Sequence, residues 1–151
     1  HLTFHDQTGR KIRKFVGLTL STLGLFAMTN YVLTPKGELP WMHSEPDAVA
    51  AARTSNRPLL VDFGADWCLP CKEMDVQMFS HPDVVAELSG FTLLRVDLTR
   101  EDDDPALAMV KSKYDVNTLP AVRVVSPEGH IVQRFDTIVD APTFLKGLAR
   151  R

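Results

Sequence analysis

The only two cysteines of this 151-residue chain, Cys68 and Cys71, stand where an apolar strand pattern gives way to a helical pattern. A thiol at the start of a helix faces unpaired backbone N–H groups and the positive end of the helix dipole, which both favour the thiolate. Cys68 is therefore the candidate nucleophile and the thiol expected to be more exposed. Cys71, one turn further on, is spaced to attack a mixed disulfide formed on Cys68 and release the product. The pattern predicts a redox-active Cys68–Cys71 disulfide that needs no further cofactor.

Two other uses of the cysteine pair have less support. A structural zinc site needs four Cys or His ligands, and the five histidines show no ligand spacing relative to the cysteines. A purely structural disulfide would close a loop too short to stabilise the fold by much. We therefore expect no metal site.

Length and composition indicate one folded domain with an appendage. With 44% hydrophobic and 24% charged residues, the chain is long enough to bury one core. The formal net charge is −2 although a basic cluster, Arg10-Lys11-Ile12-Arg13-Lys14, lies near the start, so the rest of the chain is acidic. An acidic folded part argues against nucleic-acid binding.

Residues 15–33 carry no charge and directly follow the basic cluster. This length is close to the roughly 20 residues that cross a hydrocarbon core. The pattern predicts a transmembrane helix, with residues 1–14 kept in the cytoplasm by their positive charge and the rest of the chain exported. A cleavable signal peptide and a soluble amphipathic helix are the alternatives. In a bacterium, a retained anchor implies the inner membrane with the folded domain in the periplasm, and residues 34–43 read as a linker.

Helical and strand patterns alternate over residues 44–151, the predicted folded domain. The order predicts an α/β fold in which helices flank a mixed four-stranded sheet. Ser44, Asp104 and Asp140 are expected as helix N-caps. The expected helices are 44–52, 68–79, 80–88, 104–114 and a last one from 140, and the expected strands are 58–64, 91–98, 121–126 and 130–135.

Two motifs, Trp67-Cys68-Leu69-Pro70-Cys71-Lys72 and Thr118-Leu119-Pro120, resemble those of the thioredoxin fold. Residues 61–68, 71–75 and 78–84 more closely resemble the C-terminal periplasmic domain of the DsbD family of transmembrane thiol:disulfide interchange proteins. The resemblance covers residues 40–151. It implies that electrons come from a transmembrane donor and pass through the dithiol to periplasmic proteins that carry disulfides.

Asp62 is a lone carboxylate in an otherwise apolar strand, so burial should raise its pKa. The resemblance implies that Asp62 accepts the Cys71 proton; a buried aspartate satisfied by backbone donors is the alternative. Thioredoxins often place a buried lysine opposite this aspartate. The second expected strand offers Leu93 and Leu94 instead, so we expect proton handling around Asp62 to differ from that of thioredoxins.

Other site residues follow from the resemblance. Pro120 matches the family's cis-proline, whose loop with Leu119 pairs with the substrate backbone, and Trp67 should shield the dithiol and contact the substrate. Asp75 matches an acidic position that raises the pKa of the first cysteine; a solvated surface aspartate is the alternative.

The predicted function is that of a membrane-anchored, periplasmic disulfide reductase. An oxidase or isomerase is a second hypothesis, although the chain between Cys68 and Pro120 is too short for the helical insertion of DsbA-like oxidases. A non-enzymatic thioredoxin-fold adaptor is the third.

Overall fold

The computed structural model describes residues 16–29 and 39–149, which belong to two compact units, His1–Lys36 and Gly37–Arg151. In the first unit, residues 16–29 form an α-helix with exposed apolar side chains, among them Leu18, Leu23 and Phe26. Within the described residues, no helix is both long and apolar enough to cross a membrane. The predicted basic segment 1–14, both ends of the predicted span 15–33 and residues 34–38 of the predicted linker lie outside the described residues.

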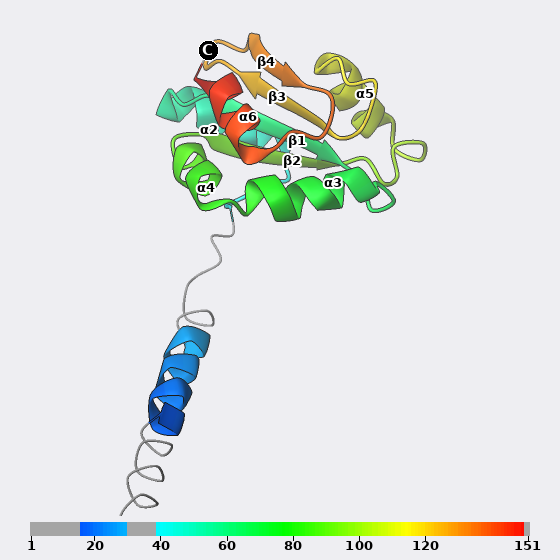
Figure 1. Cartoon of the computed structure of the whole chain (residues 1–151). Coiled ribbons are helices and arrows are strands. Elements are labelled where there is room, and N and C mark those ends of the chain that lie inside the picture. Colours follow the sequence, from blue (N-terminus) through cyan, green and yellow to red (C-terminus); the bar gives the residue numbers. More distant parts are fainter. Residues whose placement is uncertain (1–15, 30–38, 150–151) are drawn as a thin grey trace, which may run out of the picture. The chain divides into compact units, whose positions relative to one another are not determined.

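The second unit is built on a mixed four-stranded sheet of order β2-β1-β3-β4 (Figure 1). The central strand β1 runs parallel to β2 and antiparallel to β3, and β3 pairs antiparallel with β4. This confirms the predicted sheet. The strands are β1 (Leu59–Gly64), β2 (Thr92–Asp97), β3 (Ala121–Val125) and β4 (Ile131–Phe135).

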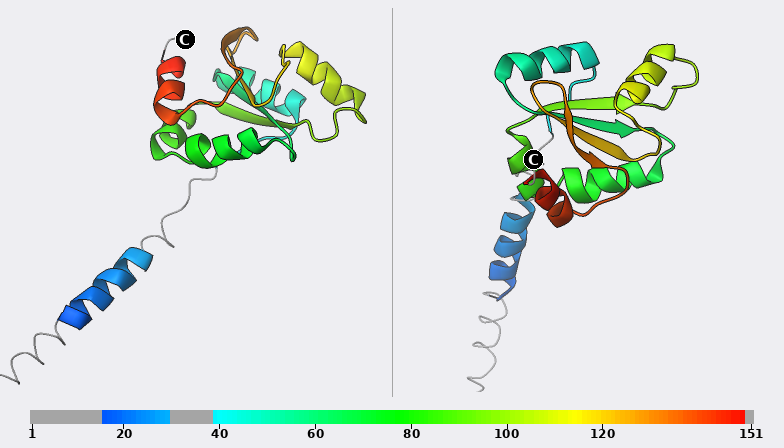
Figure 2. Two further views of the ribbon diagram at one scale, coloured as in Figure 1. Left: turned by 45° about the vertical axis from the view of Figure 1, so that its right-hand side comes forward. Right: turned by 90° about the horizontal axis from the view of Figure 1, so that it is seen from above.

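Helices cover both faces of this sheet, as the right-hand view of Figure 2 shows. One layer holds α2 (Glu45–Ser55) and α5 (Pro105–Lys113). The other holds α3 (Leu69–Met74), the π-helix η1 (Asp75–Phe79), α4 (Pro82–Leu88) and α6 (Ala141–Leu148). The predicted helix 68–79 is thus an α-helix that widens into a π turn.

Local signals explain where these helices begin. α2, α3, α4, α5 and α6 each have a proline in the first turn, where the missing N–H costs no hydrogen bond. The side chains of Asp104 and Asp140 cap α5 and α6 by accepting from Ala106 N at 2.9 Å and Thr143 N at 3.0 Å. Ser44 occupies the N-cap position of α2, but its side chain makes no capping hydrogen bond.

The core has two layers because β1 is buried on both faces. Leu60 and Val122 face the α3–α6 side and pack with Phe144, whereas Val61 and Phe63 face α2 and α5. This arrangement explains the continuous apolar run of β1. Asp62 interrupts that run on the α3 side.

Part of the segment expected as a linker belongs to the folded unit. The backbone of Met42 donates to Leu93 O and accepts from Arg95 N, both at 2.8 Å, along the free edge of β2. Leu39 and Trp41 pack against the α3-side core. The sheet therefore holds the chain from Leu39 onward.

A buried arginine that the sequence patterns did not single out ties β3 to its flanking loops. Arg123 is 1% exposed and donates to Tyr114 O at 3.0 Å, Asp115 O at 2.8 Å and an Asp136 carboxylate oxygen at 2.5 Å. These bonds fix the segments before Pro120 and after β4. The carbonyl groups would lose their partner if the guanidinium were removed.

We expect Arg123→Met to lower the free energy of unfolding by roughly 3 kcal/mol, because it leaves buried carbonyls without a donor. Arg134→Met is the matched control: Arg134 lies opposite Arg123 on β4, pairs with Asp115, and its side chain is 46% exposed. Its loss should be below about 1 kcal/mol. Urea denaturation of both variants measures the difference. Equal losses would contradict the inference that Arg123 fixes the segments before Pro120 and after β4.

Candidate active site

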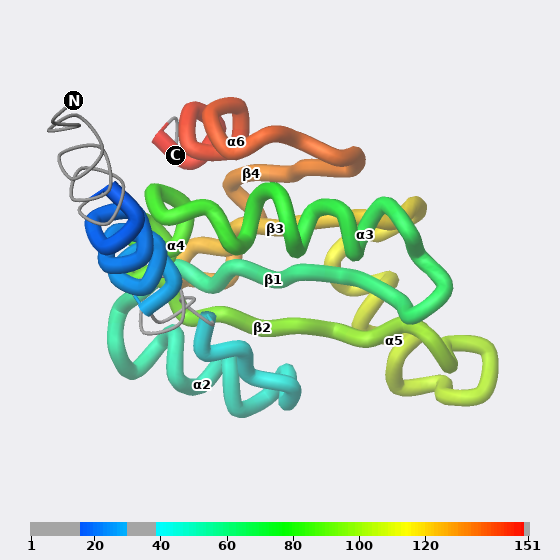
Figure 3. Tube along the Cα trace, turned by 60° about the horizontal axis from the view of Figure 1, so that its bottom comes forward, coloured from blue at the N-terminus to red at the C-terminus, as the bar shows by residue number. Residues whose placement is uncertain are grey.

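The candidate site lies where β1 ends and α3 begins. Figure 3 shows the chain turning at this end of the sheet and α3 running back along it. The backbone N–H of Asp66 donates to Thr99 Oγ1 at 2.8 Å, and that of Cys68 donates to Ala65 O at 3.0 Å. The first bond holds the connecting loop against the segment that follows β2. The second lies within the loop and places Cys68 at the N-terminus of α3.

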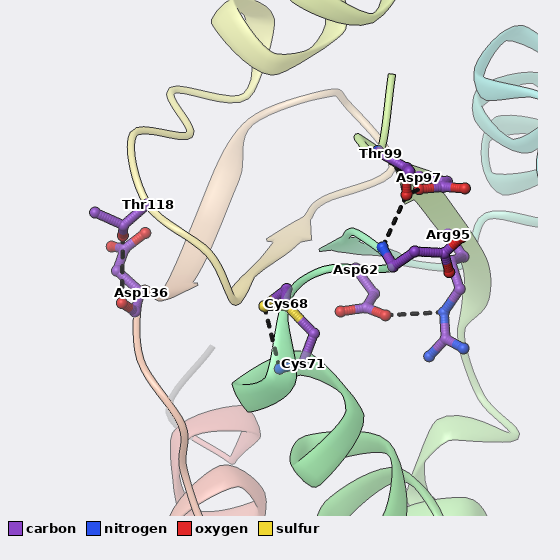
Figure 4. Close-up of a disulfide and its surroundings, with 9 residues drawn as sticks. Asp62, Cys68, Cys71, Arg95, Asp97, Thr99, Thr118 and Asp136 are labelled. Carbon is purple, nitrogen blue, oxygen red and sulfur yellow. Dashed lines mark hydrogen bonds and ion pairs between the residues drawn. A yellow bond between two sulfur atoms is a disulfide. The ribbon is translucent and has the colours of Figure 1, made fainter. Parts of the chain in front are cut away.

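Cys68 and Cys71 form a disulfide (Figure 4). Cys68 is the N-cap of α3, and its sulfur accepts a hydrogen bond from the backbone N–H of Cys71 at 3.2 Å. The same N–H would stabilise a thiolate on Cys68 after reduction. The structure thus places Cys68 where the nucleophile was predicted.

The expected order of exposure is wrong for the disulfide form. Cys68 is 4% exposed, whereas Cys71 is partly exposed. The physical reason is that the Cys68 sulfur turns inward toward the helix N–H groups. The flanking side chains are instead open to solvent: Trp67 is 65% exposed and Leu69 74%. Trp67 therefore adds apolar surface beside the disulfide.

Cys71 packs directly on β1. A methyl group built on Gly64 would lie 3.7 Å from Cys71 Cβ and 4.0 Å from its sulfur. Gly64 follows Asp62 by two residues on the same face of the strand, a spacing of about 6–7 Å. The side chains of Asp62 and Cys71 therefore lie on the same face of β1, at neighbouring positions of that face.

Asp62 is buried, as predicted, with 6% of its surface exposed. Burial raises its pKa to about 6; the charge of Arg95 opposes this rise and that of Asp75 adds to it. The carboxylate accepts a hydrogen bond from Arg95 Nε at 2.9 Å. In Figure 4 it lies between the disulfide and the Arg95 guanidinium.

The sequence reasoning missed Arg95. The parallel register pairs Asp62 with Arg95 and places Leu93 and Leu94, which the sequence analysis had set opposite Asp62, next to Leu60 and Val61 instead. A shift of one residue in register reverses which side chains face a given layer. The available signal was the single basic residue in an otherwise apolar strand pattern.

Asp75 contacts the same arginine. It begins η1, and its carboxylate accepts from the Arg95 Nη2 group. This contact brings Asp75 into the electrostatic environment of Asp62, whose pKa it raises. The predicted effect of Asp75 on Cys68 stays a prediction.

The Leu119–Pro120 peptide bond is cis, as expected from the motif. Ala121 pairs with Phe63, so Pro120 lies next to Gly64 and hence at the Cys71 end of β1. Pro120 is buried and Leu119 partly exposed. The structure therefore gathers Cys68, Cys71, Asp62 and the cis-proline loop at one end of the sheet.

No group of three or more His, Cys, Asp or Glu side chains in the described part of the chain could hold a metal ion.

Comparisons with known proteins agree with this geometry. Residues 40–127 match the family described as thioredoxin-like. The thiol:disulfide interchange protein DsbD 2 of Pseudomonas aeruginosa is 38% identical over 99 residues, which cover 64% of this chain and 16% of that protein. Similar DsbD proteins include one from Pseudomonas fluorescens, 35% identical over 101 residues, which cover 66% of this chain and 17% of that protein.

Among solved structures, the oxidised C-terminal domain of DsbD from Neisseria meningitidis is similar, with a TM-score of 0.61 and 25% identity. That match covers 73% of this chain and 97% of the domain. The chain thus spans about a sixth of the curated relatives it matches but nearly all of the solved C-terminal domain. The chain belongs to the thioredoxin-like family and is homologous to the C-terminal domain of DsbD thiol:disulfide interchange proteins.

Proposed function

We propose that this chain is a membrane-anchored thiol:disulfide oxidoreductase that reduces disulfides of periplasmic proteins through Cys68 and Cys71. One observation carries the proposal: the Cys68–Cys71 disulfide lies at the N-terminus of α3 and packs on β1, the strand that carries the buried Asp62 carboxyl group. The homology to DsbD proteins supports the direction of electron flow.

The reaction begins with the reduced dithiol. The Cys68 thiolate attacks one sulfur of the substrate disulfide, forms a mixed disulfide and releases the first substrate thiolate. Cys71 then loses its proton, attacks the Cys68 sulfur and releases the second substrate thiolate. The substrate disulfide gains two electrons and becomes two thiols after protonation, while Cys68 and Cys71 are oxidised to the disulfide.

Asp62 is the proposed acceptor of the Cys71 proton. A base works best when its pKa lies near the working pH, and burial raises the pKa of Asp62 to about 6. Asp62 lies two residues before Gly64, on which Cys71 packs, and we propose that a bridging water carries the proton between the two side chains. No metal or other cofactor takes part in the proposed reaction.

The exposed surface around the disulfide supports contact with protein substrates. Trp67 and Leu69 are exposed beside the buried Cys68 and supply apolar area. We propose that the Leu119–Pro120 segment binds the substrate backbone and that Asp75 tunes the dithiol.

The proposal of a membrane anchor is based on the sequence of residues 15–33, and the proposal of a transmembrane electron donor is based on the DsbD relatives. Residues 15–33 are free of charge and follow a basic cluster, which suits a span whose preceding residues stay in the cytoplasm. The DsbD relatives are named thiol:disulfide interchange proteins. We propose the bacterial inner membrane as the location, with the catalytic unit in the periplasm and a transmembrane protein or domain as its electron donor.

Replacing Cys71 by Ser should trap mixed disulfides between Cys68 and substrate proteins, because no thiol remains to resolve them. Non-reducing gel electrophoresis of trapped cells, followed by mass spectrometry, identifies the adducts. Cys68→Ser is the matched control and should trap far fewer. The reverse pattern would exchange the roles of the two cysteines, and no adducts with either variant would contradict the reductase proposal.

Asp62→Asn should slow resolution of a preformed Cys68 mixed disulfide by about 100-fold at pH 7, because the amide cannot accept a proton. The wild-type rate should rise as pH increases through about 6, and the variant should lack this rise. Quenched single-turnover reactions between pH 5 and 9 measure both. Asp66→Asn, at an exposed carboxylate in the adjacent loop, should keep the wild-type profile.

Stability gives a second readout for Asp62. Its pKa in the folded protein is above the ordinary aspartate value of 3.8, so the folded state binds the proton more tightly and the protonated form stabilises the fold. The wild type should therefore lose stability as pH rises from about 4 through 6, and Asp62→Asn should lack this loss. Denaturation of the oxidised proteins at each pH measures it; parallel curves would show that Asp62 titrates normally.

Removing residues 1–36 should leave a redox-active unit, since the compact unit begins at Gly37. In cells this unit should accumulate in the oxidised form when exported, because it loses the high effective concentration that a tether gives it beside a membrane donor. Alkylation trapping of Cys68 and Cys71 measures the redox state. A truncated unit that stays as reduced as the full chain would contradict coupling to a membrane donor through residues 15–33.

A further inference from the structure

Arg95 joins the buried carboxylate to the surface of the protein. Its Nε donates to Asp62 at 2.9 Å, and its Nη2 group donates to Asp75. The exposed fraction of the side chains rises along this row, from 9% for Asp62 through 28% for Arg95 to 42% for Asp75. The guanidinium thus divides its donors between an interior carboxylate and a surface carboxylate.

Two aromatic rings hold the guanidinium in this position. The Arg95 Cζ atom lies 4.4 Å from the centre of the Trp41 ring and 5.8 Å from that of Phe79. The two rings contact each other edge to face, with centres 5.1 Å apart. A cation over a tryptophan face is stabilised electrostatically, most of all where water is partly excluded.

The backbone reinforces the same contact. Met42, next to Trp41, accepts a hydrogen bond from the Arg95 N–H at 2.8 Å and donates to Leu93 O. Asp75 and Phe79 begin and end η1 and lie four residues apart, so both can face Arg95. The entry segment, β2 and η1 therefore all converge on one side chain.

This arrangement suits a carboxylate that changes charge. When Asp62 accepts a proton it becomes neutral, and an arginine with no second partner would be left as an uncompensated, partly buried cation. Asp75 remains as the counter-ion of Arg95 in that state. When Asp62 is ionised, the same guanidinium offsets its charge.

We propose that Arg95, held by Trp41, is a positioning residue that orients the Asp62 carboxylate and balances its charge during thiol–disulfide exchange. The inference rests on the proposed function, because it assumes that Asp62 exchanges a proton with Cys71. It assigns a reaction role to Trp41 in the segment that leads into the domain.

The charged surroundings of Asp62 are simple. β2 supplies Arg95 and η1 supplies Asp75, while β3 places the apolar Val122 opposite Asp62. The charged residues in the middle of α3, Lys72 and Glu73, are exposed. Burial is the largest influence on the pKa of Asp62 and raises it, and the charge of Arg95 is the next and lowers it.

Arg95→Met in the full chain keeps the length of the side chain and removes its charge. The pH midpoint of the Asp62-dependent resolution rate should rise by about one pH unit, which is about a fivefold loss of rate at pH 6 and little loss at pH 9. Arg95→Lys should reverse part of this shift. An ammonium group carries the same charge but lacks the planar set of N–H donors with which a guanidinium bonds two carboxylates. Arg100→Met, at an exposed arginine outside the site, should match the wild type.

Trp41 is tested separately. Trp41→Leu should move the same midpoint upward and cost about threefold in rate at pH 6, since it removes the ring face, and Trp41→Phe should restore most of the rate. Carbon-13 NMR can follow the titration of the Asp62 carboxyl group in the oxidised protein. Its midpoint should be lowest in the wild type, higher in Trp41→Leu and highest in Arg95→Met. This titration does not depend on catalysis.

The outcomes separate this inference from the proposed function. If Asp62→Asn already has the wild-type pH profile, the proton-acceptor role fails for every variant. If Asp62→Asn changes the profile and Arg95→Met does not, the positioning role of Arg95 is overturned. Should Arg95→Met fail to fold, Arg95→Lys and Trp41→Leu carry the test, and unshifted midpoints in both overturn it. Arg95→Met added to Asp62→Asn should leave the profile unchanged, and an additive loss would also overturn it.

Discussion

The ion pair between Asp62 and Arg95 places charge inside a layer that is otherwise built from apolar side chains. Removing a carboxylate from water costs several kcal/mol, and a single hydrogen-bonded guanidinium returns only part of that cost. The result is a carboxyl group with a pKa of about 6, near the strand position on which Cys71 packs. This carboxyl group can serve a nearby thiol only if the two are held in place. The mixed sheet, the start of α3 and the cis-proline loop supply that rigid frame.

Much of the frame was predictable because it follows from local signals. Apolar runs gave the strands, and prolines with Asp104 and Asp140 gave the helix starts. The Cys68–Leu69–Pro70–Cys71 motif and Leu119–Pro120 located two parts of the site, and the disulfide and the cis bond confirm these structural expectations. The roles assigned to Asp62, Asp75, Trp67 and the cis-proline loop stay predictions.

The missed residues depend on pairing between distant segments. Arg95 meets Asp62 only because β1 and β2 pair in one register. Arg123 finds its partners only because two segments, the one before Pro120 and the one after β4, bring their oxygen atoms to it. No periodicity in either strand contains that information, since the side chains concerned are 33 residues apart for Asp62 and Arg95. The exposure of the cysteines was misjudged for a related reason: the helix start draws the Cys68 sulfur inward.

The Met42 contact also affects how molecules meet one another. β2 is an outer strand of the sheet, and an uncovered outer strand presents N–H and C=O groups to which a strand from another molecule can add. Met42 occupies two of these groups, at Leu93 and Arg95, in the middle of the strand. The segment that leads into the domain thereby hinders edge-to-edge association at the outer strand that carries Arg95.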